Sequence, residues 1–182
     1  MKIGIAVVLS SIAFIPSLAA WADGPKRLEA DLVGYNEPPS ISTPASGEFD
    51  ARLLNDDQEI HYRLSYGGFE AGTTVLQAHI HLGQRGVNGG ISVWLCGNPS
   101  VTPPVNPPIG VQGCPPFPAT IEGIIKPEHV IGPTAQGITA GEFNELVRAI
   151  RAGATYVNVH TNRFPGGEIR DQIRSDRGRH HH

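Results

Sequence analysis

Apolar and polar residues alternate along several short stretches of the chain, and segments rich in glycine and proline separate these stretches. Alternation with a period of two is typical of half-buried β-strands. The predicted strands span residues 27–33, 47–54, 59–66, 75–82, 91–95, 120–125, 155–161 and 168–173. The pattern therefore predicts an all-β fold, a Greek-key β-sandwich or barrel of about eight strands with one short amphipathic helix.

The helix is predicted where the period changes to that of an amphipathic helix. Thr139 and Glu142 have the Thr-x-x-Glu spacing of a capping box. The apolar positions that follow at helical spacing are Phe143, Leu146, Val147 and Ile150. Gly153 supplies the stop signal. We expect this helix to pack its one apolar stripe against the strands.

Residues 1–22 have the pattern of a secretory signal peptide: Lys2, an apolar stretch over residues 3–18, and the small-residue pattern from Ala20 to Ala22. The apolar stretch is shorter than the roughly 20 residues that a membrane-spanning helix needs. We therefore expect a secreted or periplasmic protein without a membrane anchor. The folded domain would span residues 23–175, and residues 176–182 would form a mobile tail or a tag remnant, whose histidines we exclude from any site.

Composition narrows the candidate partners and suggests a disulfide. The chain has 14 basic and 17 acidic residues, a formal net charge of −3, and no basic stripe that would indicate nucleic-acid binding. Its only two cysteines, Cys96 and Cys114, flank a proline-rich segment that we expect to be a surface loop. In an exported protein such a pair is typical of a disulfide, which would stabilise the fold by about 3 kcal/mol, the alternative being two free thiols.

Two histidines share one face of the predicted strand 75–82. Side chains alternate faces along a strand, and the apolar set here is Leu76, Ala78, Ile80 and Leu82. That set must face the core. His79 and His81 therefore point together to the opposite face, at a spacing that lets both imidazoles reach one ion.

Two further histidines follow the same parity on other strands. His160 lies on the non-core face of strand 155–161, because Val157 and Val159 take the core face. His61 likewise faces away from the apolar set of strand 59–66. Neutral imidazole suits copper and zinc, so we predict a metal site of His79, His81 and His160, with His61 as a candidate fourth ligand. The alternative is that these are ordinary surface histidines.

Arg170 is the candidate catalytic residue. Ile169 and Ile173 are expected to point inward, so Glu168 and Arg170 face the histidine side. The guanidinium could draw a small anionic substrate toward a metal by long-range attraction. The alternative is an ion pair between Arg170 and Glu168 or another acid.

An ordered series of motifs covers essentially the whole chain after the predicted signal. It comprises residues 32–39 (Leu-Val-Gly-Tyr-Asn-Glu-Pro-Pro), 43–47, 78–83 (Ala-His-Ile-His-Leu-Gly), 88–90, 156–161 (Tyr-Val-Asn-Val-His-Thr) and 166–170 (Gly-Gly-Glu-Ile-Arg). The series resembles the CHRD (chordin-type) domain family. Asp171 departs from the glycine common there, and we expect this to affect only a local turn. The family includes an animal growth-factor antagonist and many bacterial exported proteins without assigned activity, so the resemblance implies a fold more than a function.

A more distant resemblance concerns the histidines themselves. His79 and His81 with the Leu-Gly that follows look like the copper-ligand strand of copper/zinc superoxide dismutases, and residues 157–160 resemble their later single-histidine strand. The zinc loop of those enzymes has no counterpart here, so the likeness implies a copper-only site. It suggests a copper-dependent superoxide dismutase in which Arg170 steers superoxide.

Two other functions remain open. One is a zinc-hydroxide enzyme, for which the sequence singles out no proton acceptor. The other is a non-enzymatic extracellular binding or adhesion module whose metal is structural or absent. The sequence also leaves open whether the protein forms a homo-oligomer or binds an extracellular protein partner.

Overall fold

The computed structural model describes residues 26–54, 58–100 and 105–175. The strands are β1 (Lys26–Val33), β2 (Ser46–Leu54), β3 (Glu59–Gly67), β4 (Val75–Leu82), β5 (Gly90–Gly97), β6 (Ala119–Ile125), β7 (Thr155–Thr161), β8 (Ile169–Gln172) and β9 (Arg174–Ser175). The helix is α1 (Phe143–Arg151), and three short 3-10 turns span Gly34–Asn36, Pro127–His129 and Thr134–Gln136. The predicted signal peptide and tail lie outside the described residues.

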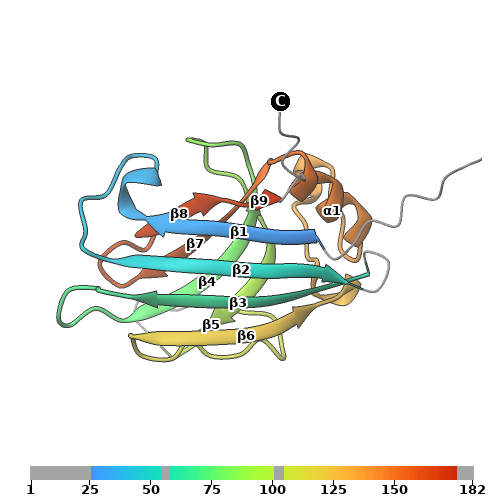
Figure 1. The fold of residues 1–182 in the computed structure, drawn as a ribbon. Helices are drawn as coiled ribbons and strands as arrows, with labels where there is room; N and C mark the ends of the chain where they lie inside the picture. The colour runs from blue at the N-terminus through green and yellow to red at the C-terminus, as the bar shows by residue number, and fades with distance from the viewer. Residues whose placement is uncertain (1–25, 55–57, 101–104, 176–182) are drawn as a thin grey trace, which may run out of the picture.

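The strands form one antiparallel sheet that curls into a nearly closed barrel (Figure 1). Its order is β5-β4-β7-β8-β1-β2-β3-β6, with the short β9 beside β1. β1, β2, β3 and β6 make the wall nearest the viewer, and β4, β5 and β7 cross behind it. Because β3 pairs with β6, β4 with β7, and β1 with β8, neighbours in the barrel are far apart in the chain. The all-β prediction is confirmed.

The barrel interior holds the apolar face of each strand, as the alternation predicts. In β3, buried residues occupy every second position, and they are Ile60, Tyr62, Leu64 and Tyr66. The same alternation buries Phe49 and Ala51 in β2. Removing this apolar surface from water is the main stabilising contribution of the core.

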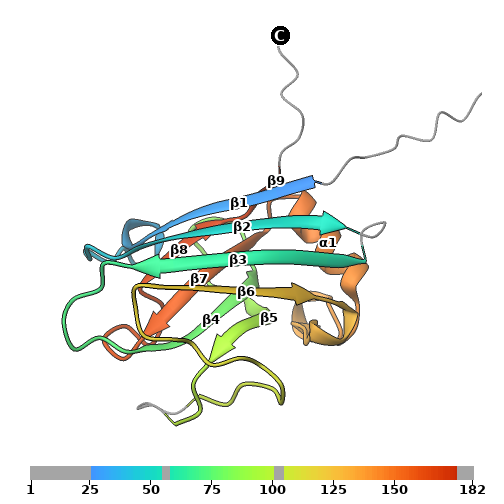
Figure 2. The ribbon, with the colours of Figure 1, turned by 60° about the horizontal axis from the view of Figure 1, so that its bottom comes forward.

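Helix α1 covers one end of the barrel (Figures 1 and 2). It buries the four apolar residues that the sequence placed on one stripe, Phe143, Leu146, Val147 and Ile150. It begins at Phe143, later than a cap at Thr139 would place it, because Glu142 itself is the N-cap residue. The Glu142 carboxylate still accepts a hydrogen bond from the Thr139 backbone N–H at 2.7 Å. No helix in the described ranges is long and apolar enough to cross a bilayer.

A strap of irregular chain closes the seam where β5 and β6 do not pair. Cys96 at the end of β5 forms a disulfide with Cys114, which confirms the predicted pair. The side-chain amide of Gln112 donates to the Tyr62 hydroxyl at 2.9 Å and to the Glu122 carbonyl at 3.1 Å. The Tyr62 hydroxyl donates to the carbonyl of Leu95. The strap, residues 105–114, thus supplies hydrogen bonds across the seam through Gln112, whose carbonyl also accepts the backbone N–H of Gly97 in β5.

Candidate metal centre

Three histidines meet on the outer face of the barrel, where β4 and β7 run side by side. Asn158 in β7 lies opposite His79, and Gln77 in β4 lies opposite His160, so all these side chains share the non-core face. The face is not open to solvent: His79 is 0 % exposed, and His81 and His160 are each 7 % exposed. The reading of these residues as surface histidines is therefore wrong. The loops that follow β4 and β7 bury them, which strand parity alone could not reveal.

The nitrogen atoms of the three rings converge. One ring nitrogen of each histidine lies within 4.8 Å of those of the other two. His79 Nδ1 and His160 Nε2 are 3.2 Å apart. Two donors bound tetrahedrally to zinc at about 2.0–2.1 Å lie about 3.3 Å from each other, so this separation fits two ligands of one ion. The Nε2 atoms of His79 and His81 are buried and have no hydrogen-bond partner.

Backbone carbonyls fix the orientation of two of the rings. His81 Nδ1 lies 3.0 Å from the Gly89 carbonyl, and His160 Nδ1 lies 2.9 Å from the Pro165 carbonyl. A carbonyl can only accept, so each Nδ1 carries the proton and each Nε2 keeps its lone pair. A hydrogen bond of this kind from the outer nitrogen is typical of metal-binding histidines.

Burial keeps all three imidazoles neutral. It lowers the pKa of His81 to about 4, and the Gly89 carbonyl opposes this shift. It also lowers the pKa of His160 to about 4, and that of His79 well below its usual range. Neutral imidazole is the form that binds metals, so at neutral pH no proton has to leave the cluster first.

Aromatic rings wall the cluster on two sides. The Tyr156 ring stacks on His81 with centroids 4.8 Å apart and an interplanar angle of 1°. The Trp94 ring stands perpendicular to His79, with centroids 4.2 Å apart. The Tyr156 hydroxyl accepts the backbone N–H of Gly89. These contacts lock the rotamers of both strand β4 ligands and exclude water from their edges.

Arg170 lies on the histidine side, as predicted, but it is 2 % exposed. Its guanidinium carbon lies 3.5 Å from the centroid of the Tyr156 ring. Its nitrogens donate to the Val87 carbonyl at 3.0 Å and to Asn88 Oδ1 at 3.2 Å. Arg170 thus clamps the loop between β4 and β5 over the site. Its positive charge is close to the cluster, and each of its two terminal nitrogens makes one hydrogen bond to the loop.

Glu168, the acid predicted as an alternative ion-pair partner of Arg170, forms different contacts. Its carboxylate accepts hydrogen bonds from the hydroxyls of Thr43 and Thr161. Two acids do act on Arg170 through their charges: Glu37, which lies after β1, and the neighbouring Asp171. None of the ion pairs found among the described residues joins Arg170 to Glu168, and the other acid that the alternative allowed is represented by Glu37 and Asp171.

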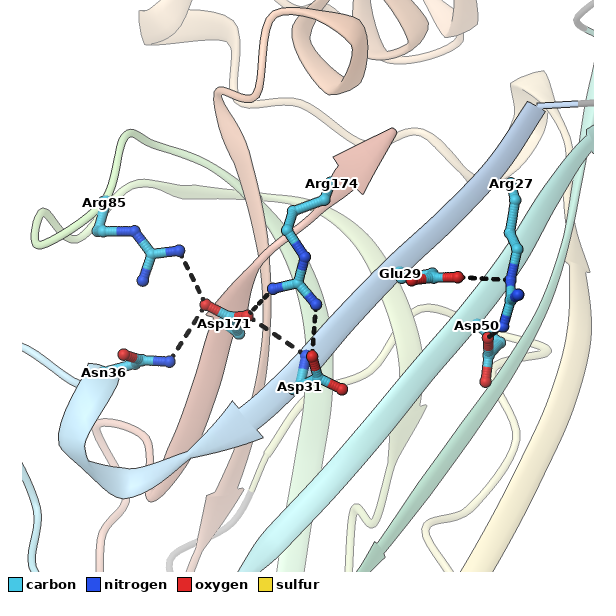
Figure 3. A network of polar contacts seen from close by, with 8 residues as sticks. All are labelled: Arg27, Glu29, Asp31, Asn36, Asp50, Arg85, Asp171 and Arg174. Atoms are coloured by element: carbon cyan, nitrogen blue, oxygen red, sulfur yellow. Dashed lines mark hydrogen bonds and ion pairs between the residues drawn. The ribbon is translucent and has the colours of Figure 1, made fainter. Parts of the chain in front are cut away.

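Asp171 anchors the same loop from the opposite side (Figure 3). Its buried carboxylate accepts hydrogen bonds from Arg85 at 3.1 Å, Asn36 at 3.1 Å and Arg174 at 2.5 Å. It also accepts the backbone N–H of Asp31. Asp171 lies within β8, so its effect is not confined to a local turn as the sequence suggested. It holds the loop whose Gly89 carbonyl orients His81.

Glu37 and Asn158 are functional candidates that the sequence did not single out. Asn158 is buried, and its Nδ2 donates to Glu37 Oε1 at 3.3 Å. Burial raises the pKa of Glu37 to about 7, while Asn158 and Arg170 oppose the shift. Strand parity could have found Asn158, because it shares a face with His160. Glu37 lies in a turn-rich segment, and only the path of that loop brings it to the site.

His61 does not join the cluster. Its Nε2 lies 3.0 Å from the Glu59 carboxylate on the same strand, β3. In the sheet, β7, β8, β1 and β2 separate β3 from β4. Strand parity points His61 away from the core, but outward faces of opposite barrel walls diverge. The prediction of His61 as a fourth ligand is therefore wrong.

Comparison with known proteins identifies the family. The model of the CHRD domain matches residues 28–173, which include every strand from β2 to β8 and all three clustered histidines. Searches of curated proteins and of solved structures each found no match.

Proposed function

The chain belongs to the CHRD domain family, and from that premise we propose that it is an exported metalloprotein that binds one copper ion and dismutates superoxide. His79, His81 and His160 would be the ligands. The Cys96–Cys114 disulfide supports export, because such bonds persist in oxidising compartments.

The observation that carries the proposal is the set of unpartnered nitrogens. A buried polar atom without a hydrogen bond costs about 1–3 kcal/mol, so folds rarely retain one without a ligand or water to satisfy it. Here the Nε2 of His81 lacks a partner, and the Nδ1 of His79 and the Nε2 of His160 face each other at 3.2 Å. An ion held by one nitrogen of each imidazole would satisfy these three atoms together.

Each residue around the cluster has a role in this proposal. Copper would supply the one-electron redox chemistry that superoxide dismutation requires. The Gly89 and Pro165 carbonyls keep the ligand rings oriented. Tyr156 and Trp94 exclude bulk water. Arg170 places a positive charge near the site, which favours a small anion over a larger or cationic substrate.

A second function is favoured by Glu37. With zinc in place of copper, the ion would act as a Lewis acid, and such chemistry needs a nearby proton acceptor. A buried carboxyl whose pKa is about 7 suits that role at neutral pH. Glu37 thus supports a hydrolytic or hydration activity of the same site.

The experiment is metal analysis followed by a dismutase assay. We expect about one equivalent of copper per chain after loading, together with superoxide dismutation. The double variant His79→Ala, His160→Ala should lose both, whereas His61→Ala should keep both. One equivalent of metal without dismutation would favour the zinc enzyme or a structural metal. Absence of binding by the wild type would refute every metal-dependent function and leave a binding or adhesion module.

A further inference from the structure

Asn158 carries a buried acceptor that nothing in the described residues satisfies. Its Oδ1 lacks a hydrogen-bond partner, although the whole side chain is buried. Its Nδ2 is committed to Glu37 Oε1. A carboxylate can only accept, so a charged Glu37 fixes the amide with Nδ2 toward itself and Oδ1 turned away.

Asn158 lies beside the metal centre, on the strand face that carries the histidines. Asn158 is the cross-strand partner of His79 and lies two residues from His160 on the same face. The Asn158 side chain also lies close enough to His81 to raise the pKa of that ring, against the larger lowering by burial. Because His81 donates its Nδ1 proton to the Gly89 carbonyl in a hydrogen bond, Nε2 of that ring carries a free lone pair. Asn158 Oδ1 and His81 Nε2 are thus two buried acceptors to which no described residue donates, and a cation would satisfy both.

Glu37 is enclosed by groups that respond to its charge. Arg170 from β8 favours the carboxylate, and Tyr156 from β7 is the other titratable neighbour that interacts with it. Gly167 packs against the pair: a Cβ there would lie 2.6 Å from Glu37 Oε1 and 2.4 Å from Asn158 Nδ2. The two side chains therefore have no room to move toward Gly167.

We propose that Glu37 is a positioning residue of the metal centre: its carboxylate holds the Asn158 carbonyl oxygen toward the three histidines, so that proton uptake by Glu37 weakens metal binding. A protonated Glu37 can donate to the amide oxygen, which would turn Nδ2, a donor, toward the ion. This inference rests on the proposed function only in requiring that the three histidines bind a metal.

The expected size of the effect follows from linkage. The pKa of Glu37 is about 7 without metal. If the metal-bound form keeps the carboxylate, the dissociation constant rises about tenfold between pH 8 and pH 6. Removing the charge should abolish this dependence and leave the weaker affinity at both pH values.

The experiment titrates chelator-buffered Cu²⁺ at pH 6 and pH 8, with Trp94 fluorescence as the signal, because that ring packs on His79. The chain has two tryptophans, and Trp21 lies in the predicted signal peptide, so the protein without residues 1–22 has Trp94 as its sole tryptophan. Wild type should show the tenfold change. For each of the variants Glu37→Gln and Asn158→Leu, the affinity for Cu²⁺ should differ by no more than about twofold between pH 6 and pH 8. Glu168→Gln, which removes another buried acid, should keep the wild-type dependence.

The outcomes separate the two proposals. If Glu37→Gln retains the wild-type pH dependence, the positioning role is refuted while the metal site stands. If the wild type binds no Cu²⁺ at either pH, the metal site itself is refuted. Circular dichroism establishes that each variant is folded, and Asn158→Leu tests the role independently should Glu37→Gln not fold.

Discussion

Acid should destabilise the metal-free protein through its buried histidines, and His81 allows the effect to be calculated. Burial lowers its pKa to about 4 in the folded protein, from the ordinary histidine value of 6.5 that the unfolded chain keeps. The unfolded chain therefore binds more protons than the folded one between these values, so stability falls as the pH falls through this window. The penalty decreases above pH 6.5 and is nearly absent at pH 7.5.

The magnitude follows from the two pKa values. Between pH 7.5 and pH 5, His81 alone should remove about 2 kcal/mol of unfolding free energy. Glu37 acts in the opposite direction, because its raised pKa makes the folded state the stronger proton binder below pH 7. Comparing variants with wild type cancels this contribution, since Glu37 is present in both.

The assay is urea denaturation of chelator-treated protein at pH 7.5, 6 and 5. His81→Gln should lose about 2 kcal/mol less than wild type between the extreme pH values. His129→Gln, which changes an exposed histidine, should follow wild type. Parallel pH profiles for wild type and His81→Gln would show that the ring is not buried as a neutral group, and would refute the reasoning.

Three further predictions concern the fold, each measured by urea denaturation. Leu64→Ala should cost about 2–5 kcal/mol because the side chain is fully buried in the barrel, and a loss below about 1 kcal/mol would contradict that core. The double change Cys96→Ser, Cys114→Ser should cost about 3 kcal/mol by freeing the strap over the seam, and an unchanged midpoint would argue against the disulfide. Gly167→Ala should cost about 1–3 kcal/mol, because its φ is +128° and a Cβ would strike Asn158; a neutral effect would mean that this region can rearrange.

Much of the barrel could be predicted because each strand repeats a local rule. From the alternation of apolar and polar residues, β4 and β7 were predicted with the same bounds that the structure shows. The same rule placed His79, His81 and His160 on one face before any strand neighbours were known. The spacing of its apolar residues predicted helix α1. The start of the helix could not be predicted as well, because Thr139 and Glu142 are both possible N-cap residues and the structure uses Glu142.

The rest of the site depends on contacts that local pattern does not encode. His61 obeys the same parity rule as the other three, but strand order places it on another wall. The burial of the cluster comes from loops, whose path is set by distant residues such as Arg85 and Asp171. Glu37 reaches Asn158 across 121 positions of sequence. Period and parity describe single strands, so none of these contacts could be read from them.

The most direct test of the metal centre is an electron paramagnetic resonance spectrum of the protein loaded with one equivalent of Cu²⁺. Ligation by His79, His81 and His160 predicts a type 2 copper signal with nitrogen coupling, which the His79→Ala, His160→Ala variant should lose. A spectrum identical to that of copper in buffer, or one that the double variant retains, would contradict a three-histidine site.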